Sequence, residues 1–245
     1  QEDRGEQGGE EIGMKKIELL FATLLFVGCG CLVVYILYQP PPVDNKKIIE
    51  DAIREILNKS DDPLTKDDLL SVEFLDLAVD RENNPQLKDF GITSVTPLKG
   101  LTNLISLKLG DNKITDLAPL ATLTKLEKLD LTHNKITDVT PLAGLTKLEV
   151  LQLGWNYQLT DITPLASLIN LKYLNLARNN ITDLTPLAGL TNLTKLHIFD
   201  NPITDISPLA KLTALKDLFI GEIEDPISEA QKVMLRKALP DCDIY

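Results

Sequence analysis

The sequence repeats itself every 22 or 23 residues, and this repeat limits the possible folds more than any other feature. Successive units share the pattern L-T-x-L-x-x-L-x-L-x-x-N-x-[IL]-T-D-x-x-P-L-A-x with few departures. Five full units begin at Leu101, Leu123, Leu145, Leu168 and Leu190, and a truncated sixth begins at Leu212. A period of roughly 20–50 residues is typical of solenoids, in which each unit covers the hydrophobic face of its neighbour.

Each unit predicts one strand and one return turn. Leu107-Lys108-Leu109 and its equivalents alternate apolar and polar residues, which indicates a half-buried strand. A fixed asparagine follows each strand, and we expect its buried amide to satisfy backbone groups at the turn. These residues are Asn112, Asn134, Asn156, Asn179 and Asn201.

The second half of each unit contains a hydroxyl residue before proline, as in Thr140-Pro141 and Ser207-Pro208. This pair predicts a short helical turn capped by the hydroxyl. Ala118 lacks a hydroxyl and should make the weakest cap. An aspartate precedes each turn, and we expect this row to serve local turns, since hard cations need six or more converging oxygens. The row comprises Asp116, Asp138, Asp161, Asp183 and Asp205.

This pattern resembles that of leucine-rich repeats, and the T-D-x-x-P-L-A segment is similar to the bacterial, internalin-like 22-residue subclass. The resemblance covers about residues 72–221. It implies an α/β fold: a right-handed horseshoe solenoid with a concave parallel β-sheet and short 3-10 or turn segments on the convex side. It also implies protein recognition, without identifying a partner.

Stacked repeats expose apolar surface at both ends, so the chain should contain two caps. Residues 46–71 predict a helical N-cap, because apolar residues from Ile48 to Leu57 follow helical spacing and Thr65 begins a second helix. Residues 222–245 predict the C-terminal cap, with a helix opening at Ser228 and a last strand in which Cys242 is a buried apolar residue.

The uncharged, apolar segment 19–38 is long enough to cross the roughly 30 Å hydrocarbon core of a membrane as a helix. We therefore expect an uncleaved signal anchor in residues 14–38, followed by a linker at residues 39–45. A cleaved secretory signal usually has a shorter apolar core. The acidic residues 1–13 indicate a disordered or artefactual extension. Flanking lysines favour an extracytoplasmic repeat domain at the cell membrane.

Two other interpretations of this segment stay open. The sequence from Met14 is similar to a bacterial lipoprotein signal, with Cys29 as the lipidation site, although Phe26 departs from that motif. The segment could also be a buried core helix.

Composition excludes several functions. The net charge of −11, without a basic stretch, argues against nucleic-acid binding. Two histidines and three cysteines leave little material for a metal site or a disulfide scaffold. The sequence contains no Gly-rich phosphate loop and no nucleophile motif. We therefore expect neither an enzyme nor a metal or small-molecule cofactor.

Candidate binding residues occupy the variable positions beside the framework leucines, which should face solvent on the concave side. Aromatic residues make up only 5% of the chain, yet most of those in the repeats fall at these positions or just beyond them. Aromatic residues with arginine beside them are typical of protein-binding hot spots. The candidate residues are Trp155, Tyr157, Tyr173, Arg178, His197, Phe199 and Phe219.

The sequence thus predicts a membrane-anchored leucine-rich-repeat protein whose concave face binds a protein or peptide. Three alternatives remain. The aromatic side chains could merely pack on one another and on the C-terminal cap. Trp155 and Tyr173 could stack on the sugars of a carbohydrate or of peptidoglycan. The solenoid could also serve only as a structural spacer at the cell surface.

Overall fold

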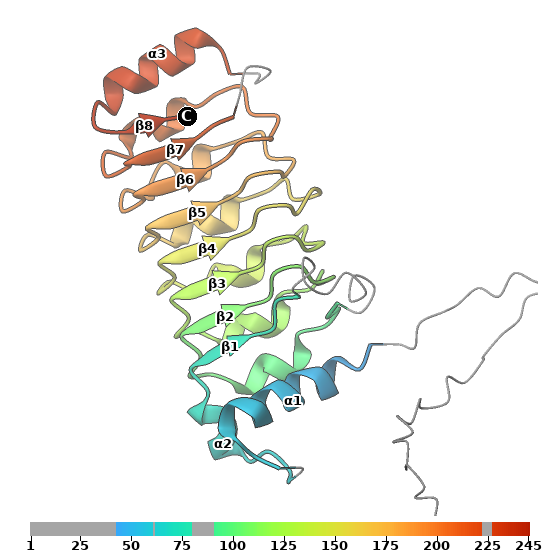
Figure 1. The fold of residues 1–245 in the computed structure, drawn as a ribbon. Helices are drawn as coiled ribbons and strands as arrows, with labels where there is room; N and C mark the ends of the chain where they lie inside the picture. Colours follow the sequence, from blue (N-terminus) through green and yellow to red (C-terminus); the bar gives the residue numbers. More distant parts are fainter. Residues whose placement is uncertain (1–42, 61, 80–90, 222–226) are drawn as a thin grey trace, which may run out of the picture. The chain divides into compact units, whose positions relative to one another are not determined.

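The computed structural model describes residues 43–60, 62–79, 91–221 and 227–245, in which the repeats stack side by side (Figure 1). Each repeat contributes one strand to an eight-stranded sheet whose order follows the sequence, and every neighbouring pair is parallel. The strands are β1 (Phe74–Asp76), β2 (Ser106–Lys108), β3 (Lys128–Asp130), β4 (Val150–Gln152), β5 (Tyr173–Asn175), β6 (Lys195–His197), β7 (Asp217–Phe219) and β8 (Asp243–Ile244).

The alternation of apolar and polar residues explains these short strands. The central leucine of each strand from β1 to β7 is buried, as Leu151 and Leu174 are, whereas its neighbours point to the opposite face of the sheet. The register places equivalent residues opposite each other, so Tyr173 lies opposite Val150 on one side and Lys195 on the other. The predicted parallel sheet with one strand per repeat is therefore confirmed.

Short 3-10 turns return the chain behind the sheet and close the leucine-rich core between the two layers (Figure 1). Each turn has proline near its start, whose fixed φ suits the first helical position. The turns are η2 (Thr96–Gly100), η3 (Ala118–Thr122), η4 (Thr140–Leu142), η5 (Thr163–Ser167), η6 (Thr185–Leu187) and η7 (Ser207–Lys211).

The prediction that Ser and Thr hydroxyls cap these turns is wrong. Thr140 is itself the first residue of its turn, so its backbone N–H needs a partner, and this N–H donates to Asp138 Oδ1 at 2.8 Å. Ala118 is capped equally well, because its N–H donates to Asp116 Oδ1 at the same distance. The same bond recurs at Asp161, Asp183 and Asp205. The aspartate row thus serves local turns, as expected.

Hydrogen bonds from the side chain and the backbone of Thr140 lower the pKa of Asp138 below its ordinary value of 3.8. Thr163 and Thr185 lower the pKa of Asp161 and Asp183 in the same order, and at Asp205 the backbone of Ser207 contributes most. Each of these carboxylates is therefore held in its charged, hydrogen-bond-accepting form down to lower pH.

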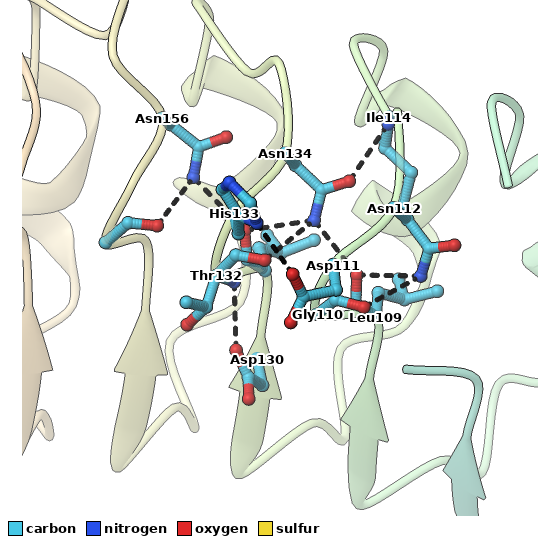
Figure 2. A network of polar contacts seen from close by, with 12 residues as sticks. Leu109, Gly110, Asp111, Asn112, Ile114, Asp130, Thr132, His133, Asn134 and Asn156 are labelled. Carbon is cyan, nitrogen blue, oxygen red and sulfur yellow. Dashed lines mark hydrogen bonds and ion pairs between the residues drawn. The ribbon is translucent and has the colours of Figure 1, made fainter. Parts of the chain in front are cut away.

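A ladder of buried asparagines links the strand ends of neighbouring repeats (Figure 2). Asn134 Nδ2 donates to the carbonyl oxygens of Leu109 at 2.9 Å and Leu131 at 3.1 Å, and its Oδ1 accepts the N–H of Ile114 at 2.9 Å. This one amide therefore bonds to its own repeat and to the preceding one. The predicted role of the fixed asparagines is confirmed, and the same arrangement recurs at Asn112, Asn156, Asn179 and Asn201.

Two helices cover the first repeat. Helix α1 (Asn45–Leu57) packs against η2 and buries Ile49 and Ile53, whereas Ile48 and Ile56 of the predicted apolar face remain 39% and 50% exposed. Helix α2 (Lys66–Ser71) begins with the predicted capping box, in which Thr65 N–H donates to the Asp68 carboxylate at 2.8 Å. Lys59 and Thr65 together lower the pKa of Asp68 to about 2.

Helix α3 (Glu229–Ala238) covers the last repeat at η7. Its N-cap Ser228 accepts the N–H of Gln231, as expected for a helix that opens at this serine. The sequence S-E-A-Q also fits a capping box, but the Gln231 side chain does not bond back to Ser228. Instead its Oε1 accepts the N–H of Ile206 at 3.2 Å, and its Nε2 donates to Asp205 at 3.1 Å. The helix is thereby bonded to the last turn of the stack. Burial raises the pKa of the half-buried Cys242 thiol to about 11.

No helix in the described ranges has both the length and the hydropathy needed to cross a membrane. The predicted anchor at residues 19–38, the possible lipidation site Cys29 and the extension at residues 1–13 all lie outside the described residues.

Candidate functional site

Four rings from neighbouring strands lie in a row on the outer face of the sheet, the face opposite the 3-10 turns. The ring centroid of His197 in β6 lies 5.4 Å from that of Tyr173 in β5 and 4.4 Å from that of Phe219 in β7. Tyr245, which follows β8, stacks on Phe219 with centroids 4.7 Å apart. Because parallel strands run about 4.8 Å apart, equivalent side chains come into direct contact across the sheet.

Two further rings join this row from the segments that leave the strands. Phe199 follows β6, and its centroid lies 6.3 Å from that of His197. Trp155 follows β4 and meets Phe199 edge to face at 6.3 Å, a geometry favoured by the ring quadrupoles. We call this set of contacting rings the aromatic patch. It comprises Trp155, Tyr173, His197, Phe199, Phe219 and Tyr245.

Two cations lie over the rings of the aromatic patch. Lys195 Nζ is 5.6 Å from the centroid of Tyr173 and 5.5 Å from that of Phe219. Arg178 Cζ is 5.4 Å from the centroid of Trp155, and Arg178 Nε donates to Asp200 Oδ2 at 2.8 Å. These distances are within the range of cation–π attraction, which therefore helps to hold both side chains on the patch.

His197 occupies the centre of the aromatic patch. Its Nε2 is closed off from solvent and has no hydrogen-bond partner among the described residues. Burial, followed by the positive charge of Lys195, lowers its pKa below the ordinary 6.5, and Asp217 only partly opposes this shift. His197 is therefore neutral at neutral pH and packs as one more ring in the row.

The residues that directly precede the ladder asparagines form a column along the stack, and their backbone has an unusual conformation that the sequence did not reveal. The residue before each ladder asparagine has a positive φ, between 55° and 60°. Aspartate and histidine tolerate this region, whereas tryptophan and arginine rarely adopt it. The only sequence signal is that none of these residues is β-branched. The column comprises Asp111, His133, Trp155, Arg178 and Asp200.

The structure brings most of the predicted binding residues together. Trp155, Tyr173, Arg178, His197 and Phe199 are linked by ring or cation contacts, and Phe219 extends the row. Tyr157 does not join them: it is 60% exposed and makes no ring contact within the described part of the chain.

One ring of the aromatic patch, Tyr245, and one of the two cations over it, Lys195, were not among the predicted binding residues. Lys195 occupies a variable position beside a framework leucine, but a lysine at such a position is usually an ordinary solvated side chain, so the sequence did not single it out. Tyr245 reaches the patch only because β8 pairs in parallel with β7, which places it beside Phe219.

Several of the variable positions that were predicted to face solvent are buried, among them Ala177 and Asn175. Asn175 of β5 is only 6% exposed, because the neighbouring strand is followed by Gly154, which leaves room for its amide. A Cβ at Gly154 would lie 3.1 Å from that amide. Asn175 Oδ1 also accepts the N–H of Ala177 at 3.0 Å. The outer face is therefore tightly packed at this point.

The described residues do not bring the two histidines together or form a metal site. His133 Nδ1 lies 2.6 Å from Asp111 Oδ1, and His197 belongs to the aromatic patch, so the two histidines do not meet. Across residues 43–245, leaving aside the gaps at 61, 80–90 and 222–226, no three His, Cys, Asp or Glu side chains are grouped to hold a metal ion.

Comparisons with known proteins agree with this architecture. The family model described as "Leucine Rich repeats (2 copies)" matches five overlapping segments that together span residues 102–229. Internalin C2 of Listeria monocytogenes has a similar structure, with a TM-score of 0.70 and 36% identity, covering 80% of this chain and 81% of that one. No curated protein matches the chain in a sequence comparison.

Two longer proteins are also similar. Internalin F of Listeria monocytogenes has a TM-score of 0.69 and 32% identity, over 83% of this chain and 57% of its own. A leucine-rich-repeat protein of Leptospira interrogans has a TM-score of 0.61 and 27% identity, over 74% of this chain and 51% of its own. The matched repeats, the parallel sheet and the shared structure place the chain among the bacterial, internalin-like leucine-rich-repeat proteins.

Proposed function

We propose that this chain is a membrane-anchored recognition protein and that its aromatic patch binds a protein or peptide. The fold supports protein recognition in general. The observation that carries the specific proposal is the concentration of six contacting rings and two cations on the outer face of β4 to β8. None of these side chains belongs to the buried leucine core, so the repeat fold itself does not require them.

The packing within the patch favours binding. Trp155, Tyr173 and Phe199 are half-buried, so their rotamers are restricted by neighbouring rings before any partner arrives. A partner then covers apolar surface without ordering many flexible side chains. Aromatic residues and arginine dominate binding energy in such preorganised centres.

The orientation of the rings favours a protein over a carbohydrate. Sugar stacking needs an open ring face, but one face of Trp155 is covered by Arg178, and one face of Phe219 is covered by Tyr245 at an interplanar angle of 18°. Lys195 lies over both Tyr173 and Phe219. The patch therefore combines partly covered rings with two cations, a mixed polar and apolar surface that a protein partner can match.

The membrane anchor is part of the same proposal and rests on the sequence of residues 19–38. An uncleaved helix there would hold the repeat domain at the extracytoplasmic surface of the cell membrane. Lipidation of Cys29 is the alternative. Metabolic labelling with a fatty acid, compared between the natural chain and Cys29→Ser, separates the two: label lost in the variant would overturn the uncleaved anchor.

Crosslinking in membranes tests the binding proposal. The full chain is compared with the triple variant Trp155→Ala, Tyr173→Ala, Phe199→Ala and with Phe74→Ala, which removes an exposed ring from β1, outside the patch. We expect the triple variant to lose proteins that the natural chain and Phe74→Ala both capture. Capture of the same proteins by all three would overturn the claim that the aromatic patch is the binding surface.

A further inference from the structure

The Arg178 side chain is held in place by two neighbouring repeats. Its guanidinium lies over the ring of Trp155 from the preceding repeat, 5.4 Å from the centroid. Its Nε donates to Asp200 of the following repeat at 2.8 Å. Together the two contacts restrict where the guanidinium can lie.

The outer edge of this guanidinium is unused. Arg178 Nη1 and Nη2 have no hydrogen-bond partner among the described residues, and the side chain is 45% exposed. Arginine carries five N–H donors in a rigid fork, of which only Nε–H is bonded here. Two parallel N–H groups on this edge match the two oxygens of a carboxylate, and such bidentate pairs are among the strongest hydrogen bonds in proteins.

The arrangement differs from the one at the other end of the same column. Asp111 and His133 bond to each other, so that pair is satisfied within the chain. Trp155, Arg178 and Asp200 also adopt positive φ, a conformation that is unfavourable for Trp and Arg in particular. Unlike Asp111 and His133, Arg178 keeps N–H groups on Nη1 and Nη2 that no described residue accepts. The stack therefore presents a positioned cation beside apolar rings.

The other cation of the patch is a poorer carboxylate site. Lys195 carries a compact ammonium, which lacks the planar fork that matches both oxygens of a carboxylate. Asp217 lies opposite it on β7 in the strand register, just as Asp200 lies beside Arg178, so neighbouring carboxylates do not distinguish the two cations. Arg178 has its own neighbouring carboxylate at Nε, where it orients the fork and leaves the opposite edge open.

We propose that Arg178 is the specificity residue of this face, binding a carboxylate of a peptide or protein partner through Nη1 and Nη2. The partner segment carries Asp, Glu or a C-terminal carboxylate next to an apolar side chain, which contacts Trp155 and Phe199. This inference rests on the proposed function, and it adds the chemistry that the partner must present.

Selection from a random 12-residue peptide library on the full chain in detergent micelles provides the probe. We expect selected peptides to be enriched in an acidic residue beside an apolar one. For a synthesised peptide, changing its acidic residue to the amide should weaken binding at least tenfold, as should Arg178→Gln in the protein, because each removes a charged, bidentate pair. The two changes combined should cost no more than either alone.

Matched variants control the experiment. Arg178→Lys keeps the charge but loses the fork, so we expect it to restore only part of the affinity. Lys172→Gln removes a cation paired with Glu149 outside the patch and should leave affinity within twofold. Far-UV circular dichroism confirms that each variant is folded.

Four results would overturn the inference: no peptide selected, no acidic enrichment, independent effects of the two changes, or Arg178-dependent binding of uronic-acid glycans in place of peptides. If peptide binding requires Trp155 but neither Arg178 nor an acidic residue, the carboxylate inference fails and the proposed function stands. If binding is also insensitive to Trp155, both fail.

Discussion

Replacing Asn156 by alanine should destabilise the repeat stack far more than an ordinary Asn→Ala change. Asn156 is fully buried, and its Oδ1 accepts the N–H of Ile136 at 3.0 Å, which has no other partner in the described structure. Its Nδ2 donates to the carbonyl oxygens of Leu131 and Leu153 at 3.1 and 2.9 Å. Alanine removes all of these bonds and leaves a buried N–H unsatisfied.

The magnitude follows from which groups lose their last partner. The Leu131 carbonyl keeps Asn134, and the Leu153 carbonyl keeps Asn179, so these acceptors remain bonded. The orphaned Ile136 N–H alone costs about 1–3 kcal/mol, and the lost donor bonds add roughly 1 kcal/mol. We therefore expect the free energy of unfolding to fall by about 3 kcal/mol.

Urea denaturation followed by far-UV circular dichroism measures this loss. With a slope of about 2 kcal/mol per molar urea, the midpoint should fall by about 1.5 M. Asn192→Ala is the matched control, because Asn192 is exposed and makes one bond to the Ile169 carbonyl at 2.8 Å. The control should lose less than about 1 kcal/mol. Equal losses in the two variants would refute the role assigned to the asparagine ladder.

Three further predictions concern the turns, the left-handed column and the aromatic patch. Asp138→Ala should lower the free energy of unfolding by about 1 kcal/mol, whereas Thr140→Ala should cost less because the backbone N–H of residue 140 still donates to the Asp138 carboxylate. If urea denaturation shows the reverse order, the hydroxyl of Thr140 and not Asp138 is the cap. His133→Val should be about 1–2 kcal/mol less stable than His133→Gly, since both lose Asp111 but only valine is strained at a φ of 55°; equal midpoints would count against that strain. Because burial lowers the pKa of His197, the unfolded chain binds a proton at higher pH than the folded chain, so stability should be full above pH 6.5 and fall as the pH drops through the lower folded value. Thermal unfolding across that range should show this slope in the natural chain and a smaller slope in His197→Gln; identical slopes would contradict it.

The repeat made most of the fold predictable. A leucine at every second strand position and an asparagine after each strand specify one parallel strand and one buried turn per unit, and both are found. The capping residue was misassigned because Thr140-Pro141 matches the usual cap-then-proline pattern. Only the backbone geometry shows that Thr140 already lies inside its turn, which makes Asp138 the acceptor.

The site was predictable in composition but not in detail. Strand register predicts the row of Tyr173 beside Lys195 and of His197 beside Phe219, because these pairs occupy equivalent positions on neighbouring strands. The contact of Trp155 with Phe199 joins two different repeat positions two repeats apart, which the register alone does not predict. The positive φ of Arg178 depends on how the chain leaves the strand, which residue type does not reveal. Tyr245 joined the patch through the pairing of β8, a long-range contact outside the repeat pattern.

Affinity for a captured partner tests the central claim most directly. The dissociation constant of the full chain in detergent micelles is measured for one crosslinked protein, together with those of Trp155→Ala and Phe74→Ala. The proposed binding face predicts that Trp155→Ala weakens binding about 30-fold or more, as expected for a hot-spot residue worth at least about 2 kcal/mol, while Phe74→Ala stays within twofold. A folded Trp155→Ala variant that binds as tightly as the natural chain would contradict the claim that the aromatic patch is the binding surface.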